Sequence, residues 1–115
     1  MSRRATGIAG EAIAANFLRQ HGFFILATNV RTPFGEIDVL ARAKDGTVVY
    51  CEVRTRLTAE FASPAESIHQ RKLQHMIRSA EFIQKRQFQG ARLRLDLISV
   101  QAGKVVDHLQ NIEIA

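Results

Sequence analysis

The chain has 115 residues, 46% of them hydrophobic, with 16 Lys and Arg against 11 Asp and Glu for a formal net charge of +5. This size and composition suit a single globular domain, residues 1–115, and argue against a disordered chain. The positive charge favours a polyanionic partner, nucleic acid first, although solubility alone is the simpler explanation. The one cysteine, Cys51, excludes an internal disulfide and a cysteine-based zinc site.

The N-terminal segment begins with basic residues and continues with an apolar stretch, as a targeting signal would. Glu11 and Asn16 interrupt that stretch, so neither a signal peptide nor a membrane-spanning helix is predicted. We therefore expect a cytoplasmic protein.

The first predicted element is a helix from Thr6 to His21, a stretch rich in Ala, Leu and Ile that Gly22 is placed to end. Apolar and alternating segments then predict three strands in succession, at residues 23–30, 35–43 and 48–56. Pro33 and Gly35 mark the turn between the first two strands.

A second helix is predicted from the capping box Ser63-Pro64-Ala65-Glu66, with apolar residues at helical spacing as far as Ile83 and an end before Gly90. Two more strands are predicted at residues 91–100 and 105–114, joined by a turn at residues 102–104. The order of helix, three strands, helix and two strands predicts an α/β fold with a central mixed five-stranded sheet flanked by helices.

The loop between the second and third strands decides whether Asp38 and Glu52 meet. A two-residue loop at residues 45–46 would turn the two carboxylates to opposite faces of the sheet. A three-residue loop at residues 44–46, with Gly46 left-handed, would set Asp38 directly across from Glu52. We expect the longer loop, because it gathers four hydrophobic residues on the other face: Ile37, Val39, Cys51 and Val53.

Two carboxylates directly opposite each other repel and destabilise a hairpin. Either a hard divalent cation between them or an ion network with nearby arginines would remove that repulsion. A third acid, Glu11, projects from the apolar face of the first helix towards the sheet, where an unpaired carboxylate is costly. The alternative for Glu11 is a partly exposed position at the edge of a broad Ala-rich face. Spacing alone therefore leaves the metal site and the ion network both open.

Four segments of the chain, within residues 7–100, resemble the YraN family of predicted bacterial endonucleases: GEAIAANFLRQHGFFILATNVRTPFGEIDVLA, VVYCEVRTR, SPAESIHQRKLQHM and RLRLDLISV. That family is similar to the restriction-endonuclease-like superfamily, whose signature is an Asp followed at a distance by Glu-x-Lys, and to archaeal Holliday-junction resolvases. The resemblance implies a restriction-endonuclease-like domain that cleaves DNA, with branched or structured DNA as the expected substrate. A homodimer is expected only by analogy, because two cuts need two sites.

By position, the Asp and Glu of the signature correspond to Asp38 and Glu52, and the helical acid of the resolvases corresponds to Glu11. The resemblance implies a catalytic site of Asp38, Glu52 and Arg54. It also implies Mg²⁺ or Mn²⁺ held by Asp38, Glu52 and the backbone carbonyl of Val53, with Glu11 helping to bind or orient the cation. Three cations are expected to contact phosphates: Arg31, Arg56 and Lys72.

Arg54 departs from the signature, which has Lys at this position. A guanidinium is effectively always protonated, so it cannot take a proton from water, but it can hold the scissile phosphate. Three alternatives follow: the metal activates water without a lysine, Lys72 on the second helix takes the place of the missing Lys, or activity is lost. The competing functions are a non-catalytic nucleic-acid-binding module that keeps the nuclease fold and a scaffold domain whose charges form only ion networks.

Overall fold

The computed structural model describes residues 3–56 and 70–112, with side chains described from residue 9 to 56 and from 71 to 112. Along the described chain the elements are α1 (Arg3–Gln20), β1 (Phe24–Thr32), β2 (Gly35–Arg42), β3 (Val48–Arg56), α2 (Gln70–Gln87), β4 (Leu93–Gln101) and β5 (Lys104–Leu109). The expected order of elements is confirmed. The capping box at residues 63–66 lies outside the described residues.

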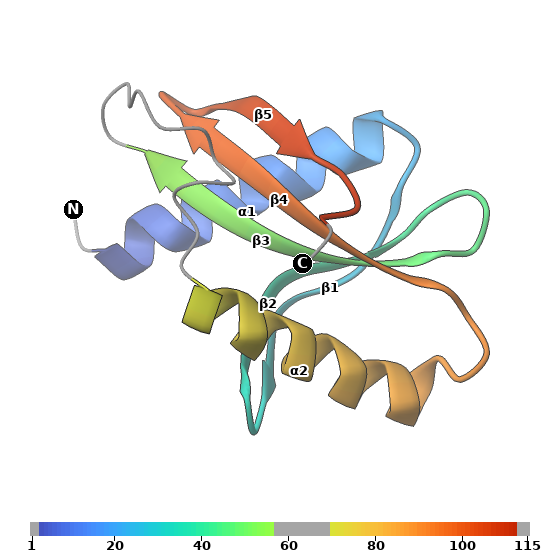
Figure 1. Ribbon diagram of the computed structural model, residues 1–115. Helices are drawn as coiled ribbons and strands as arrows, with labels where there is room; N and C mark the ends of the chain where they lie inside the picture. Colours follow the sequence, from blue (N-terminus) through green and yellow to red (C-terminus); the bar gives the residue numbers. More distant parts are fainter. Residues whose placement is uncertain (1–2, 57–69, 113–115) are drawn as a thin grey trace.

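The described strands form one five-stranded sheet in the order β1-β2-β3-β4-β5. β3 and β4 run parallel, and the other neighbouring pairs are antiparallel, so the sheet is mixed as predicted. The parallel pair follows from α2, which carries the chain from the end of β3 back to the start of β4 (Figure 1). Neither described helix has the apolar length that a membrane crossing requires.

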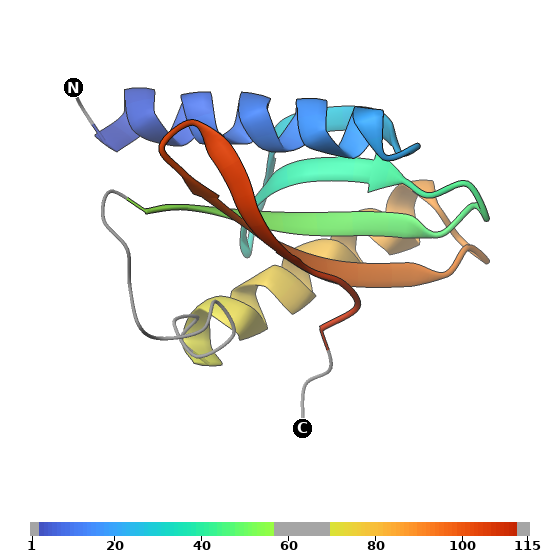
Figure 2. The same ribbon diagram turned by 90° about the horizontal axis from the view of Figure 1, so that it is seen from above.

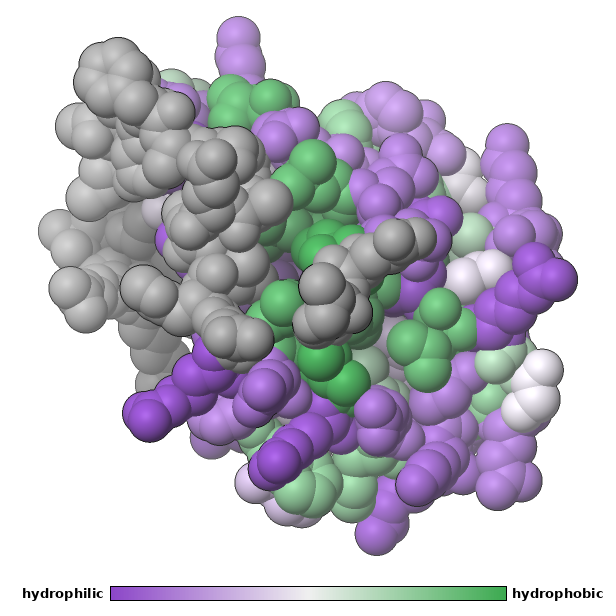
Figure 3. Space-filling view, viewed as in Figure 1, coloured by the Kyte–Doolittle hydropathy of each residue, from purple (hydrophilic) through white to green (hydrophobic). Residues whose placement is uncertain are grey.

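The two helices cover opposite faces of the sheet, which places a hydrophobic layer on each side (Figure 2). Ala14 and Leu18 of α1 pack with residues such as Val39 and Cys51 on one face. Met76, Ala80 and Ile83 of α2 pack on the other face, with Tyr50 of β3 among their neighbours. Over the middle of the side that carries β4 and β5, hydrophobic side chains gather within a hydrophilic surround (Figure 3).

The loop between β2 and β3 has the three-residue form that was expected. Ala43 N donates to Thr47 O at 2.9 Å, Gly46 N donates to Ala43 O at 3.0 Å, and Gly46 has a φ of 93°. The resulting ladder sets Val39 opposite Cys51 and ends at that pair, so Asp38 and Glu52, which the same register would have paired next, are not partners in the ladder. One detail of the prediction is wrong: Ile37 packs in the layer under α2 and not beside Val39. The part of β2 that precedes Val39 is not paired with β3, so the register of that ladder does not set the face of Ile37.

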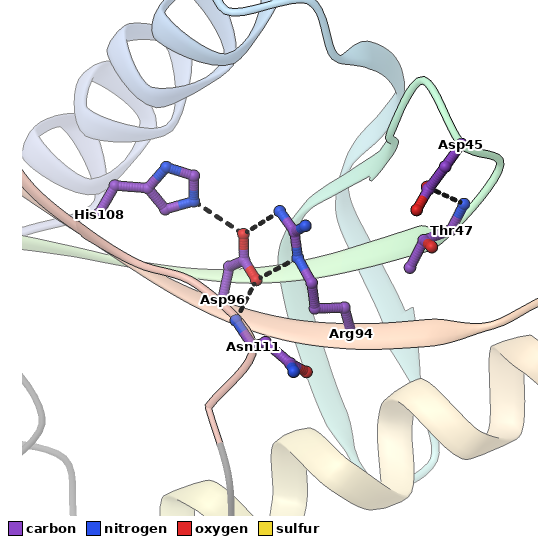
Figure 4. Close-up of polar contacts among 6 residues, drawn as sticks. All are labelled: Asp45, Thr47, Arg94, Asp96, His108 and Asn111. Atoms are coloured by element: carbon purple, nitrogen blue, oxygen red, sulfur yellow. Dashed lines mark hydrogen bonds and ion pairs between the residues drawn. The ribbon is translucent and has the colours of Figure 1, made fainter.

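The last strand is shorter than predicted, ending at Leu109 instead of residue 114. The chain turns at Asn111, which has a φ of 53°. Asn111 N then donates to the carboxylate of Asp96 at 2.9 Å (Figure 4). Ile112 N donates to Leu95 O at 2.7 Å. The backbone N–H groups of Asn111 and Ile112 are therefore already hydrogen-bonded and do not extend the ladder of the strand.

Candidate metal centre

The candidate site lies at a fork in the sheet, where β2 and β3 separate. Pairing between them stops at Val39 and Cys51, although β2 stays paired with β1 back to Gly35. β3 in turn stays paired with β4 as far as Arg56. Asp38 is the first residue of β2 beyond the split, and its Oδ2 accepts a hydrogen bond from Val53 N at 2.8 Å. The side chain of Asp38 therefore takes the place of the lost ladder bond, which fixes its carboxylate in the fork.

Helix α1 brings Glu11 to the same place. The contact is close because Gly10 has no side chain: a Cβ there would clash with the hydroxyl of Thr55 on β3. Glu11 follows directly and is buried, with its carboxyl group hydrogen-bonded to the side chains of Asn29 and Asp38. Its Oε2 is buried and has no hydrogen-bond partner among the residues that the structure describes. The expectation that Glu11 points from the apolar helical face towards the sheet is confirmed.

Burial and neighbouring negative charges raise the pKa values of two acids at the fork, Asp38 and Glu11. Burial raises the pKa of Asp38 to about 8, and the charge of Glu52 adds to this rise, while the bond from Val53 N opposes it. Burial likewise raises the pKa of Glu11, with further contributions from the charges of Glu36 and Glu52. The site is thus built around carboxyl groups that resist ionisation unless a positive charge joins them.

Without divalent cations, Asp38→Asn is expected to raise the melting temperature at neutral pH, by about 4–8 °C for each kcal/mol of repulsion removed. Between pH 3.8, the ordinary pKa of Asp, and about 8, Asp38 is ionised in the unfolded chain but stays protonated in the folded chain. The stability of the wild type therefore falls as the pH rises through this window. Asn keeps an oxygen for the N–H of Val53 but carries no charge. Thermal unfolding in EDTA across this window should show the gain growing with pH.

The matched control is Glu81→Gln, which neutralises an exposed carboxylate on α2. A gain from Asp38→Asn that stays constant with pH, or a loss, would show that the folded state does not feel the repulsion.

A hollow of about 270 Å³ opens onto the fork from the side of α2. Its lining combines acids with basic and small residues: Gly35, Glu36, Asp38, Glu52, Lys72, His75 and Met76. Lys72 Nζ lies 2.5 Å from Glu52 Oε1, with the lysine side chain 53% exposed and the glutamate side chain only 8%. The hollow therefore places a solvent-accessible ammonium directly on one of the buried site acids.

The three arginines among the predicted site residues differ in burial and in their position relative to the fork. Arg54 is two positions beyond Glu52 on β3, half-buried, and its Nε has no hydrogen-bond partner among the described residues. Arg56 is buried, which is unexpected for a phosphate contact. Arg31 is exposed on β1, opposite Glu36 of β2. Among the described residues Lys72 makes an ion pair with Glu52, while Arg94, one of the arginines near the sheet, pairs with Asp96.

Two residues of the site, Glu36 and His75, were not predicted from the sequence. One oxygen each from Glu11, Glu36 and Asp38 lie within 4.8 Å of one another, so Glu36 belongs to the acid cluster. Its signal was present, because Glu36 and Asp38 are two positions apart on one strand and share a face. His75 reaches the hollow from α2, three residues after Lys72, and no local pattern marked it.

Comparisons place the chain among known proteins. The model of the family described as "Uncharacterised protein family UPF0102" matches residues 10–100. A UPF0102 protein of Dehalococcoides mccartyi is 39% identical over 116 residues, covering 99% of this chain and 94% of the relative. A UPF0102 protein of Persephonella marina is 38% identical over 106 residues, covering 91% and 90%.

Among solved structures, the chain is similar to a repair endonuclease from Pyrococcus abyssi, with a TM-score of 0.52 and 20% sequence identity. The match covers 80% of this chain but only 38% of that one, so the chain spans less than half the length of its structural neighbour. This likeness is one of fold, and it confirms the restriction-endonuclease-like architecture predicted from the resemblance.

Proposed function

The chain belongs to the uncharacterised protein family UPF0102, the family that the YraN resemblance indicated, and we propose that it is a metal-dependent endonuclease that hydrolyses phosphodiester bonds. The observation that supports this most strongly is the group of three acids at the fork, Glu11, Glu36 and Asp38, one of which keeps a buried oxygen without a partner. Such a group is unstable by itself and becomes favourable once a cation joins it.

In this proposal Mg²⁺ or Mn²⁺ is held by Glu11, Asp38 and Glu52, with the carbonyl oxygen of Val53 and, in addition to the predicted set, Glu36. Carboxylate and carbonyl oxygens are the donors that these hard cations prefer, so the residues present fit the ion. When bound, the cation supplies Lewis acidity towards a phosphate oxygen and lowers the pKa of a water molecule.

The chain's own residues orient the reacting groups. The backbone N–H of Val53 holds the carboxylate of Asp38 in place by a hydrogen bond. Lys72 neutralises the charge of Glu52 and keeps N–H donors that can bind a phosphate oxygen. Arg54, two positions after Glu52 on β3 and half-buried, is the second cation proposed to hold the scissile phosphate and offset charge that develops on it. In this proposal Lys72 on α2 supplies the ammonium group that the Lys of the Glu-x-Lys signature would supply from the strand.

The proposed substrate is nucleic acid, DNA before RNA. The net charge of +5 favours a polyanion, and the structural neighbour from Pyrococcus abyssi is a repair endonuclease. Branched or structured DNA remains the proposed target within that class, with a homodimer for paired cuts. The competing function is a nucleic-acid-binding module without catalysis, and the observation that favours it is Arg54 in place of the signature Lys.

The test is a cleavage panel of linear, flapped and four-way DNA in Mg²⁺ or Mn²⁺, with Asp38→Asn as the matched variant. We expect cleavage of at least one substrate by the wild type, none in EDTA, and loss of about 10²-fold or more in the variant, because the loss of one electrostatic contact to a transition state has effects of this size. Binding without cleavage across the panel would support the module.

The same Mn²⁺ should raise the melting temperature of the wild type by mass action, and should do so much less for Asp38→Asn. An equal response in both proteins would assign the shift to screening of surface charge and remove the support for a cation at the fork.

A further inference from the structure

A second groove lies beside the carboxylate hollow and has a different chemistry. It has a volume of about 310 Å³ and is lined by two aromatic rings and three charged side chains: Phe34, Arg78, Glu81, Phe82 and Lys85. Phe34 is 43% exposed, so part of its ring faces solvent at the tip of the turn. None of these residues contributes to the acid cluster at the fork.

The ring of Phe34 is held in place by neighbours. Phe82 of α2 meets it edge-on, with ring centroids 6.1 Å apart and an interplanar angle of 69°. The guanidinium of Arg86 lies 4.4 Å from the centroid of the Phe82 ring, so Phe82 is itself covered by a cation. Phe34 is therefore the ring that offers area to solvent, and Phe82 braces it.

A hydroxyl network fastens the turn that carries Phe34 to α2. The Thr32 hydroxyl lies 2.9 Å from both the carbonyl oxygen of Gly35 and the hydroxyl of Ser79, and accepts from Phe34 N at 3.1 Å. It can donate to the carbonyl while accepting from Ser79, which is fully buried. The turn and the helix thus form one wall, and Figure 1 shows the β1–β2 turn reaching past α2. A fastened turn presents Phe34 at low entropic cost to a ligand.

The groove and the carboxylate hollow share this wall. Gly35 lines the hollow and directly follows Phe34, which lines the groove. On α2, His75 lines the hollow and Phe82 the groove, seven residues or about 10 Å apart along the helix axis. That separation is the length of about three stacked nucleotides.

The charges of the groove match a nucleic-acid strand. Arg78 and Lys85 line it and Arg86 lies over its inner ring, against one acid, Glu81. Cations at the rim and an aromatic face at the centre are the two features by which proteins bind unpaired nucleotides, since every base can stack and every nucleotide carries a phosphate. A plain duplex offers no free base face to Phe34.

We propose that this groove binds an unpaired nucleobase, stacked on Phe34, of the strand whose phosphate lies at the carboxylate site. The inference rests on the proposed nuclease function and makes it more specific: the substrate carries a single-stranded segment next to the cleavage point. Arg78 and Lys85 contact the phosphates that flank the stacked base.

The test measures equilibrium binding by fluorescence anisotropy in EDTA, where no cleavage is needed. The probes are a short single-stranded DNA, the same strand with abasic positions throughout, and a blunt duplex. Phe34→Ala and Phe34→Leu are expected to weaken binding of the single strand about tenfold, and Phe34→Trp to retain it. Leu keeps apolar packing against Phe82 but has no ring face, so weaker binding by Phe34→Leu would not be caused by misfolding. The matched control is Phe24→Ala, which removes a ring that is 67% exposed at the other end of β1.

Equal affinity of wild type and Phe34→Leu for the single strand would overturn the proposal, as would the same loss on the abasic strand. Failure of wild type to bind the single strand would also overturn it, even if the protein cleaves duplex DNA. Binding that depends on Phe34, together with no cleavage in Mn²⁺, would leave the groove assigned and the endonuclease proposal wrong.

Discussion

Asp96→Asn is expected to lower the free energy of unfolding by about 3 kcal/mol, the lower end of what breaking a buried charge pair removes. Asp96 is fully buried on β4, and its carboxylate accepts four hydrogen bonds (Figure 4). Arg94 donates through Nε and a terminal nitrogen at 2.9 Å each, His108 Nε2 lies 2.7 Å away, and Asn111 N donates at 2.9 Å. Asn can replace some of these bonds but leaves a half-buried guanidinium without its counter-charge.

The pH dependence of this loss has a defined sign. Burial alone would raise the pKa of Asp96, but hydrogen bonds from His108, Arg94 and the backbone of Asn111 outweigh it and hold the pKa below its ordinary value. The stabilisation is therefore complete above the ordinary value of 3.8 and is lost as the pH falls through the lower folded value. The difference between wild type and Asp96→Asn should be large at neutral pH and shrink in acid.

Urea unfolding at neutral pH and in acid measures both effects. The matched control is Asp107→Asn on β5, a half-buried acid whose Oδ1 accepts only the neighbouring N–H of His108, a bond that Asn also makes. A loss below about 1 kcal/mol for Asp96→Asn, or one equal to that of Asp107→Asn, would show that the network adds little beyond an ordinary surface hydrogen bond.

The parts of the site that sequence predicted are those decided by local rules. Gly46 allows the left-handed position of a three-residue loop, and that loop fixes which residues of β2 and β3 pair between Val39 and Arg42. Helical spacing put Glu11 on the apolar face of α1, and an acid on such a face has to meet something polar. Both predictions needed only a few neighbouring residues, and both are confirmed.

The parts that sequence did not predict depend on where distant segments meet. The fork exists because the start of β2, before Val39, pairs with β1 and not with β3, and no local pattern encodes which partner a strand residue takes. Ile37 changes face for the same reason. The early end of β5 depends on Asp96 of β4, whose carboxylate accepts a hydrogen bond from Asn111 N. Tertiary bonds of this kind override strand propensity.

Lys72→Met is expected to lower the rate of DNA cleavage by about 10²–10³-fold, the usual effect of removing one preorganised group that stabilises transition-state charge. The physical reason is position: Lys72 is the described cation that contacts a site acid, Glu52, while most of its side chain stays open to solvent. Arg54 sits further along β3 and cannot give up a proton, so it is expected to matter less. Arg54→Lys should then change the rate by less than about tenfold.

Single-turnover cleavage at saturating Mn²⁺ separates these roles. Lys72→Arg keeps a positive charge but has no titratable amine. If this variant keeps part of the cleavage activity, the reaction requires a positive charge beside Glu52 and the phosphate. If it loses all activity, the reaction requires a proton transfer by Lys72. Lys104→Met, which removes an exposed lysine at the start of β5, controls for the change in net charge. If Lys72→Met cleaves as fast as this control while Arg54→Lys gains activity, then the signature position itself holds the catalytic cation, and the lysine on α2 only neutralises Glu52. That result would assign the catalytic ammonium to β3 and not to α2.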